Sequence, residues 1–180
     1  MPILKTAIHP QVAGEQGRVF TRLATRAIVI RDDKILLLYT QRYDDYSLPG
    51  GGVDDGEQIE AGFIRELMEE TGATGVKNIT PLGVYEEYRP WHKPDFDTVH
   101  MLSYCFFCDI DDDLGETQLE SYEIKNGMHP VWLTLQEAIA HNEATLANSE
   151  KKGLSVEREI FLLKEVIRVC SQVGKLSYVA

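Results

Sequence analysis

The sequence predicts an α+β fold, built as a sandwich around a mixed β-sheet. Three observations support this prediction: strand-like segments come first, an amphipathic helix lies mid-chain, and helices dominate the C-terminal part. The length of 180 residues fits one domain, and we expect a single domain over residues 1–180. A hydrophobic content of 43% is ordinary for a soluble protein with a core.

Two short segments rich in Ile, Val and Leu begin the predicted sheet. Residues 21–31 and 34–40 have the composition of strands, and the Asp32-Asp33 pair between them fits a hairpin turn. Pro49 and the three glycines after it end regular structure.

A helix is predicted over residues 58–71, with Gly72 at its C-terminal stop. The apolar residues expected to face the core recur at helical spacing. They are Ala61, Ile64, Leu67 and Met68.

The rest of the chain contains further strands and helices. The predicted strands are at 75–88, 99–110 and 130–133, with a connection at 89–94 and an acidic loop at 111–126. A helix is predicted to start at the capping box of Thr134 and Glu137 and to run to about residue 141. A last helix is predicted at 155–173, before Gly174.

The charge restricts the partners of this protein. With 29 acidic and 18 basic residues the net charge is −11, so binding to a nucleic-acid backbone is not expected. A small phosphorylated substrate is compatible, because a bound divalent cation reverses the local sign of charge.

No apolar run approaches the roughly 18 residues of a membrane span, and the N-terminus lacks a signal-like segment. We therefore expect a cytoplasmic protein.

The cysteines do not predict a metal centre. Cys105 and Cys108 have the spacing of half a zinc site, but no second pair follows. Residues three apart on a strand also face opposite ways. We interpret both, with Cys170, as buried thiols in a reducing compartment.

Three glutamates crowd one face of the predicted central helix. Glu66, Glu69 and Glu70 stand at positions i, i+3 and i+4. Like charges this close are destabilising, and Arg65 alone cannot neutralise three acids. A hard divalent cation can, and carboxylate oxygens suit Mg2+ or Mn2+. The alternative is a surface helix with a solvated acidic face.

The segment around these glutamates resembles the signature of the Nudix hydrolases, G-x5-E-x7-R-E-U-x-E-E-x-G-U, where U is a bulky aliphatic residue. It spans residues 51–73 and departs from the pattern only at Ala73, which is smaller than usual. The matching residues are Gly51, Glu57, Arg65, Glu66, Leu67, Glu69, Glu70 and Gly72.

This resemblance implies an α/β/α sandwich with a mixed sheet, and hydrolysis of a nucleoside diphosphate linked to another group. Glu66 and Glu70 would be the principal Mg2+ or Mn2+ ligands, and Glu69 a ligand or a water-orienting base. Arg65 and Glu57 would hold these carboxylates in catalytic geometry. The metal would polarise phosphoryl oxygens and lower the pKa of the attacking water.

The family often recruits another acid from a loop beyond the signature. Residues 111–126 supply three candidates, Glu116, Glu120 and Glu123. Glu123 is the first choice and Glu120 the second, because Glu-Ile followed by a Trp-containing strand resembles the family layout. The alternative is a solvated loop glutamate.

Aromatic and basic residues near residue 90 are candidates for substrate contact. Tyr88 and Trp91 could stack on a base, while Arg89 and the neighbouring His92 could touch phosphate. Arg42 is a further phosphate candidate. The alternative is a hairpin tip with an aromatic lid.

The resemblance leaves the substrate open. ADP-ribose or a nucleotide-sugar-like compound is the expectation from class frequency. One alternative is a non-hydrolytic nucleotide-binding regulatory module, although the intact acid cluster argues against it. Another is an mRNA-decapping enzyme, which the net charge disfavours. A homodimer fits family habit and the prevalence of cyclic dimers.

Overall fold

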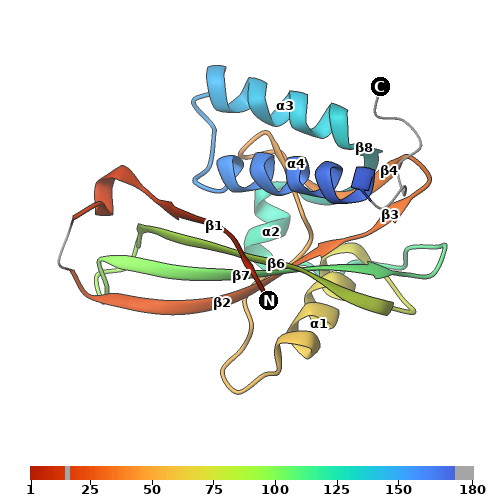
Figure 1. The fold of residues 1–180 in the computed structure, drawn as a ribbon, viewed down its shortest axis with the longest axis horizontal. Helices are drawn as coiled ribbons and strands as arrows, with labels where there is room; N and C mark the ends of the chain where they lie inside the picture. The colour runs from red at the N-terminus through yellow and green to blue at the C-terminus, as the bar shows by residue number, and fades with distance from the viewer. Residues whose placement is uncertain (15–16, 173–180) are drawn as a thin grey trace.

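The computed structural model describes residues 1–14 and 17–172, and its helices lie on both sides of the strands (Figure 1). Helix α1 (Ile59–Thr71) lies on one side, whereas α3 (Leu135–Asn148) and α4 (Val156–Gln172) lie on the other. The predicted α/β/α sandwich is confirmed.

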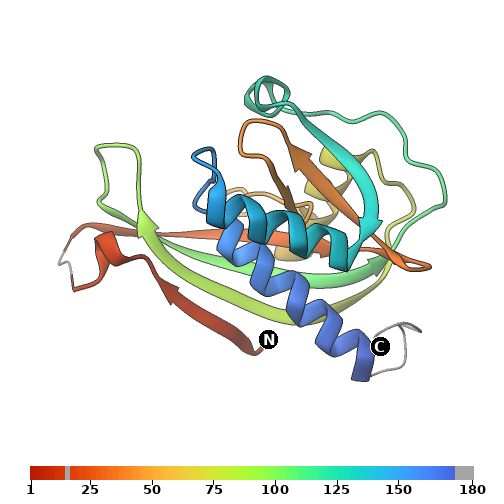
Figure 2. The ribbon, with the colours of Figure 1, turned by 90° about the horizontal axis from the view of Figure 1, so that it is seen from above.

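The larger sheet is mixed, as predicted. Its order is β1 (Ile3–Ile8), β6 (Lys77–Pro90), β7 (Thr98–Asp109) and β2 (Val19–Ile28). Strands β6 and β7 are antiparallel, while β1 is parallel to β6 and β2 is parallel to β7. Figure 2 shows these long strands extending beyond the helices.

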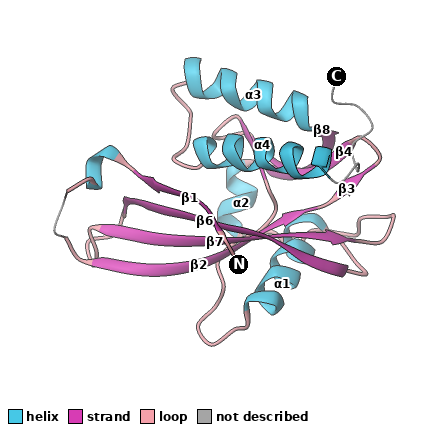
Figure 3. Ribbon diagram, in the orientation of Figure 1, coloured by secondary structure: helices cyan, strands magenta, loops and turns pink. Residues whose placement is uncertain are grey.

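The smaller sheet is antiparallel and centres on β4 (Lys34–Thr40). One edge of β4 pairs with β8 (Met128–Thr134), and the other with β3 (Ile30–Arg31) and β5 (Asp45–Ser47). The short elements η1 (Pro10–Val12) and α2 (Ser121–Asn126) complete the fold (Figure 3).

Apolar side chains form a core on each side of the sheet layer. Leu162 and Leu163 of α4 pack in one cluster with Cys105, and Phe63 of α1 packs in another with Cys108. The two thiols of the C-x-x-C pair therefore face opposite ways, and both are buried. A shared zinc ion is excluded, as the strand periodicity predicted.

The predicted core face of α1 was partly wrong. Leu67 is buried, but Ala61 is exposed and Met68 is 43% exposed, while Phe63 makes the main aromatic contact. The buried stripe also includes Glu70. A search restricted to apolar residues cannot include a buried glutamate, so it placed the face at the wrong angle.

Other boundaries also differ from prediction. The strand predicted at 21–31 is divided between β2 and β3, and β1 and β5 were not predicted. The loop predicted at 111–126 contains helix α2, which a Glu120–Glu123 capping box begins and Gly127 ends. Residues 173 and 174, at the predicted end of the last helix, lie outside the described residues.

Helix α3 continues to Asn148, beyond the predicted end near residue 141. The prediction stopped early because buried polar residues, Asn142 and Thr145, interrupt the apolar pattern of its second half. The Asn142 side chain accepts a hydrogen bond from the Tyr46 N–H (2.8 Å) and donates one to the Tyr46 carbonyl (2.8 Å).

Within residues 1–14 and 17–172, no helix is long and apolar enough to cross a membrane.

Candidate active site

The end of α1 is fixed by a glycine contact. Gly72 adopts a left-handed conformation (φ 71°), and its carbonyl accepts the Gly115 N–H at 2.7 Å. A Cβ atom at Gly72 would overlap the Gly115 carbonyl. This position therefore requires glycine and holds residues 115–118 beside the helix.

The loop before α1 is held against β2 by backbone hydrogen bonds. Thr25 N–H donates to the Gly51 carbonyl (3.0 Å), and Val53 N–H donates to the Leu23 carbonyl (3.0 Å). Gly50 has a φ of 136°, and a Cβ atom there would overlap the Thr25 carbonyl oxygen. The loop consequently lies closer to the sheet than a residue with a side chain permits.

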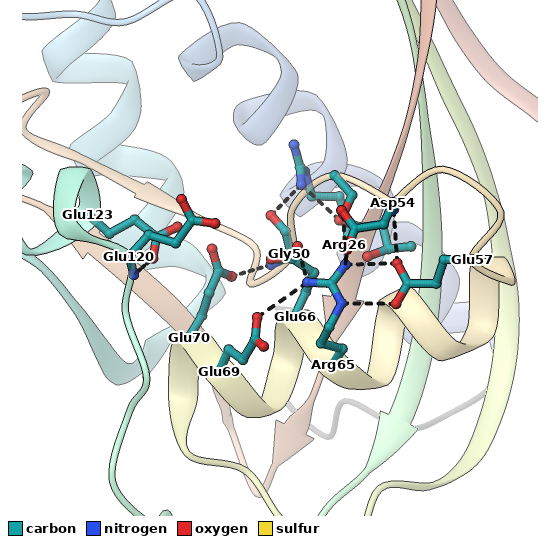
Figure 4. A network of polar contacts seen from close by, with 12 residues as sticks. Arg26, Gly50, Asp54, Glu57, Arg65, Glu66, Glu69, Glu70, Glu120 and Glu123 are labelled. Carbon is teal, nitrogen blue, oxygen red and sulfur yellow. Dashed lines mark hydrogen bonds and ion pairs between the residues drawn. The ribbon is translucent and has the colours of Figure 1, made fainter.

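Arg65 connects the loop to the acidic face of α1 (Figure 4). Its Nε and Nη2 atoms donate to both oxygens of Glu57 (2.9 and 2.8 Å), and Nη2 also donates to the Gly52 carbonyl (3.0 Å). Its Nη1 atom donates to Glu66 (2.7 Å) and Glu69 (3.3 Å). The Arg65 hydrogen bonds to Glu57, together with one from the Asp54 N–H (2.9 Å), hold the pKa of Glu57 at about 2. All five N–H groups of Arg65 are engaged.

Glu70 is the most buried acid of the cluster, at 6% exposure. Burial, which is the largest cause, and the neighbouring charges of Glu66 and Glu123 together raise its pKa to about 8. The Gly50 N–H donates to its carboxylate at 2.5 Å and opposes this shift. Burial also raises the pKa of Glu66. Both ionised carboxylates are therefore poorly compensated by the protein alone.

Helix α2 brings two further acids to the same place. Glu120 and Glu123 form a reciprocal capping box, in which Glu123 accepts the Glu120 N–H at 2.7 Å. The Tyr122 hydroxyl donates to the other oxygen of Glu123 (2.9 Å). Glu116 lies apart, in a separate hollow beside Met68 and Gly72.

These groups surround one polar cleft of about 690 Å³ between the loop, α1 and α2. Of the residues predicted for the site, Glu66, Glu69, Glu70, Arg65, Glu123 and Gly51 line this one cleft. The residues lining the cleft are Arg22, Gly51, Gly52, Val53, Asp54, Asp55, Arg65, Glu66, Glu69, Glu70, Gln118, Glu120, Tyr122 and Glu123.

The donors fit a hydrated hard cation better than a closed protein cage. In the part of the chain that the structure describes, no three acidic, imidazole or thiol side chains gather into a ready-made metal site. Arg65 and the Gly50 N–H instead occupy the carboxylates of Glu66 and Glu70. The donors are nevertheless all oxygens, and Mg2+ keeps several of its waters when it binds to carboxylates.

The residues suggested near residue 90 do not line the cleft. Tyr88 stacks on His100 (ring centroids 4.3 Å apart, planes 6° apart), and Trp91 packs edge-on against Phe20 (4.7 Å). Arg89 belongs to β6 rather than to the connection. The packing role of these aromatic rings matches the alternative of a structural hairpin end.

Arg42 also lies outside the cleft lining, where its Nη1 atom donates to Asn126 Oδ1 at 3.2 Å. Sequence reasoning missed Arg22, which does line the cleft. No local pattern identifies Arg22, because its position depends on how the glycine loop pairs with β2.

The fold and the cleft define an α/β/α protein with a carboxylate-bearing helix beside a glycine loop. A model of the NUDIX domain matches residues 21–155, and the chain belongs to this family. A solved NUDIX hydrolase from Nitrosomonas europaea has a similar fold, with a TM-score of 0.56, 19% identity and coverage of 83% of this chain and 90% of that one.

Two curated relatives carry different substrate names. An ADP-ribose pyrophosphatase of Methanocaldococcus jannaschii is 37% identical over 93 residues, which are 49% of this chain and 50% of the relative. An RNA pyrophosphohydrolase of Wolbachia sp. subsp. Drosophila simulans is 49% identical over 43 residues, 22% of this chain and 26% of the relative. The match thus spans half or less of each relative.

Proposed function

We propose that this protein is a divalent-metal-dependent pyrophosphohydrolase that cleaves the diphosphate of a nucleoside diphosphate linked to another group. One observation carries the proposal: Glu66, Glu69 and Glu70 line a single cleft together with the glycine loop. Two of these carboxylates are buried enough to raise their pKa values, which favours binding of a cation among them.

The roles of the residues follow from their contacts. Glu66 and Glu70 would hold Mg2+ or Mn2+, while Glu69, whose side chain is 40% exposed, would orient the attacking water. Arg65 and Glu57 position these groups through the hydrogen bonds between the helix and the loop. The bound metal supplies charge stabilisation for the phosphoryl group and a water of lowered pKa.

Glu123 is proposed as the further acid of the site. It lies in the cleft and is 7% exposed, and its charge contributes to the raised pKa of Glu70. Glu123→Gln is expected to reduce turnover, because the amide cannot accept a proton from water. Since Glu123 also caps α2, melting temperature is measured alongside, so that loss of the helix cap is distinguished from loss of catalysis. Near-wild-type turnover of Glu123→Gln would refute the role.

ADP-ribose is our first choice of substrate, supported by the name of the 37% identical relative. The test is product analysis with Mg2+ or Mn2+ against ADP-ribose, nucleotide sugars, dinucleotides, nucleoside triphosphates and capped or 5′-triphosphorylated RNA. The expected reaction consumes one water and yields AMP and ribose 5-phosphate. RNA cleavage alone would favour the RNA-processing alternative. Absence of turnover, with ligands still raising the melting temperature, would favour the regulatory module.

We further infer a homodimer and a cytoplasmic location. The edge strand β1 exposes Ile3 (55%) and Ile8 (58%). Its outer edge pairs with no other described strand, so it offers hydrogen bonds to a second copy. Light scattering tests the dimer: a mass of twice 20.4 kDa supports it, and a mass of 20.4 kDa contradicts it.

A further inference from the structure

We propose that Arg22 binds a substrate phosphate at the edge of the cleft, beside Gly52. The ligand class is an organic diphosphate. One of its two phosphates would lie at the cation, and Arg22 would bind the other. The assignment rests on the proposed function, because it names a contact to the diphosphate of that reaction.

The backbone fixes where Arg22 lies. An isolated bridge joins Ala24 to Gly52, and the Leu23 carbonyl accepts the Val53 N–H, so the loop runs along β2 next to Arg22. A Cβ atom at Gly52 would lie 2.8 Å from Nη2 of Arg22. The missing side chain at Gly52 therefore leaves room for the guanidinium against the loop backbone.

Arg22 is the unoccupied arginine of the cleft. Its side chain is exposed, and that side chain makes no hydrogen bond or ion pair with any residue in 1–14 or 17–172. Arg65, the other cleft arginine, uses every N–H on carboxylates and the Gly52 carbonyl. Because a guanidinium fork matches two phosphate oxygens, Arg22 has the donors that a phosphate needs and Arg65 does not.

The charges of the cleft make this contact necessary. The acids that line it, which repel any phosphate, are Asp54, Asp55, Glu66, Glu69, Glu70, Glu120 and Glu123. A cation among the α1 carboxylates compensates one phosphoryl group of a diphosphate. Arg22 compensates the other from the opposite side of Gly52, whose carbonyl Arg65 already holds.

A second guanidinium strengthens the positive potential near Arg22. The Arg89 side chain is half-buried, and its one hydrogen bond within the described residues runs from Nη2 to Met101 Sδ (4.0 Å). The nearby carboxylate of Glu87 is engaged by Arg158 (2.6 Å). Burial lowers the pKa of Arg89, the charge of Glu87 partly opposes this shift, and the positive charges of Arg158 and Arg22 add to it. An anion at Arg22 therefore also reduces repulsion between the two guanidinium groups.

The experiment measures binding of methylenediphosphonate, a non-hydrolysable diphosphate, by calorimetry in Mg2+. We expect Arg22→Gln to weaken binding by about tenfold or more, the range of a lost charge-assisted contact. Arg22→Lys keeps the charge but lacks the paired N–H donors of a guanidinium, so its affinity for the probe should lie between those of wild type and Arg22→Gln. The matched control is Arg168→Gln, an equal charge change on α4 outside the cleft, with affinity within about twofold of wild type. Melting temperature should be unchanged in Arg22→Gln, because the Arg22 side chain makes no hydrogen bond or ion pair with the described residues.

Three results would overturn the assignment: wild-type protein that does not bind the probe, Arg22→Gln that binds it as tightly as wild type, or an equal loss in Arg168→Gln. Failure of the two proposals is distinguishable. Arg22-dependent binding without turnover of any substrate refutes only the hydrolase function. Turnover with an unchanged KM in Arg22→Gln refutes only the phosphate contact.

Discussion

At the scale of single residues, the surroundings of Glu70 have opposing effects on the pKa of its carboxyl group. The Gly50 N–H stabilises its charged form, while burial and the neighbouring carboxylates favour its neutral form. Burial is the largest of these effects, and the pKa rises from 4.5 to about 8. A carboxyl in this state is partly protonated near neutral pH, and it ionises when a cation arrives.

The raised pKa of Glu70 predicts a stability that falls with pH in metal-free protein. Between pH 4.5 and about 8 the folded state binds more protons at Glu70 than the unfolded state does. The free energy of unfolding therefore decreases as pH rises through this window. Chemical denaturation in a chelating buffer at pH 5.5 and 8.5 measures the decrease.

Glu70→Gln removes this titration and is expected to show a smaller decrease than wild type. Burial also raises the pKa values of Asp45 and Glu66, so part of the decrease in unfolding free energy with pH remains in the variant. Equal decreases in wild type and Glu70→Gln would show that Glu70 is not protonated in the folded state.

At the scale of elements, the glycine loop depends on support from the far end of the chain. The Leu48 N–H donates to Glu159 of α4 (2.9 Å), and Arg26 of β2 donates to the Gly50 carbonyl. Arg158, also on α4, pairs with Glu159 (2.8 Å). Helix α4 thus connects a buried ionic network to the loop that contacts Glu70.

This network predicts a large cost for removing one of its charges. Arg158→Met leaves the buried acids Glu87 and Glu159 without their partner, and we expect a loss of about 3–5 kcal/mol in the free energy of unfolding. Arg168→Met breaks an exposed pair on the same helix and should change stability little. Urea denaturation compares the two variants. Equal small losses would mean that the buried pairs are not formed in solution.

The loop itself predicts a difference between two glycines with positive φ. At Gly50 a Cβ atom would overlap the Thr25 backbone, whereas at Gly56 it would meet no atom within 4 Å. Gly56→Ala should cost about 1–3 kcal/mol from backbone strain alone. Gly50→Ala should cost at least about 1 kcal/mol more, because the loop must move away from β2. Similar losses in denaturation experiments would contradict this close approach.

At the scale of the whole molecule, the sequence predicts the parts whose structure is determined locally. Strand β4 has the predicted bounds because a continuous Ile and Leu segment is buried between two neighbours. The acidic face of α1 follows from helical spacing alone. By contrast, β1 was not predicted, because it is an edge strand with mostly exposed side chains. The second half of α3 was not predicted, because the buried polar residue Asn142 interrupts its apolar pattern.

The residues that line the cleft were predictable where they lie close together in sequence. Its carboxylates lie close together in sequence, so their spacing indicates a shared cleft. Arg22 becomes part of the site only through pairing of Gly52 with Ala24, across nearly thirty residues of chain. Tyr88 and Trp91 have suitable chemistry for substrate stacking, but packing against His100 and Phe20 determines their surroundings.

The most direct test of the account is turnover by wild type, Glu70→Gln and Glu60→Gln in Mg2+, with the substrate that the panel identifies. Glu60 is an exposed acid of the same helix outside the cleft, so Glu60→Gln is the matched control. We predict that Glu70→Gln loses more than roughly 100-fold in kcat while Glu60→Gln stays within about twofold of wild type. Undiminished turnover in folded Glu70→Gln would contradict catalysis by a cation held on α1.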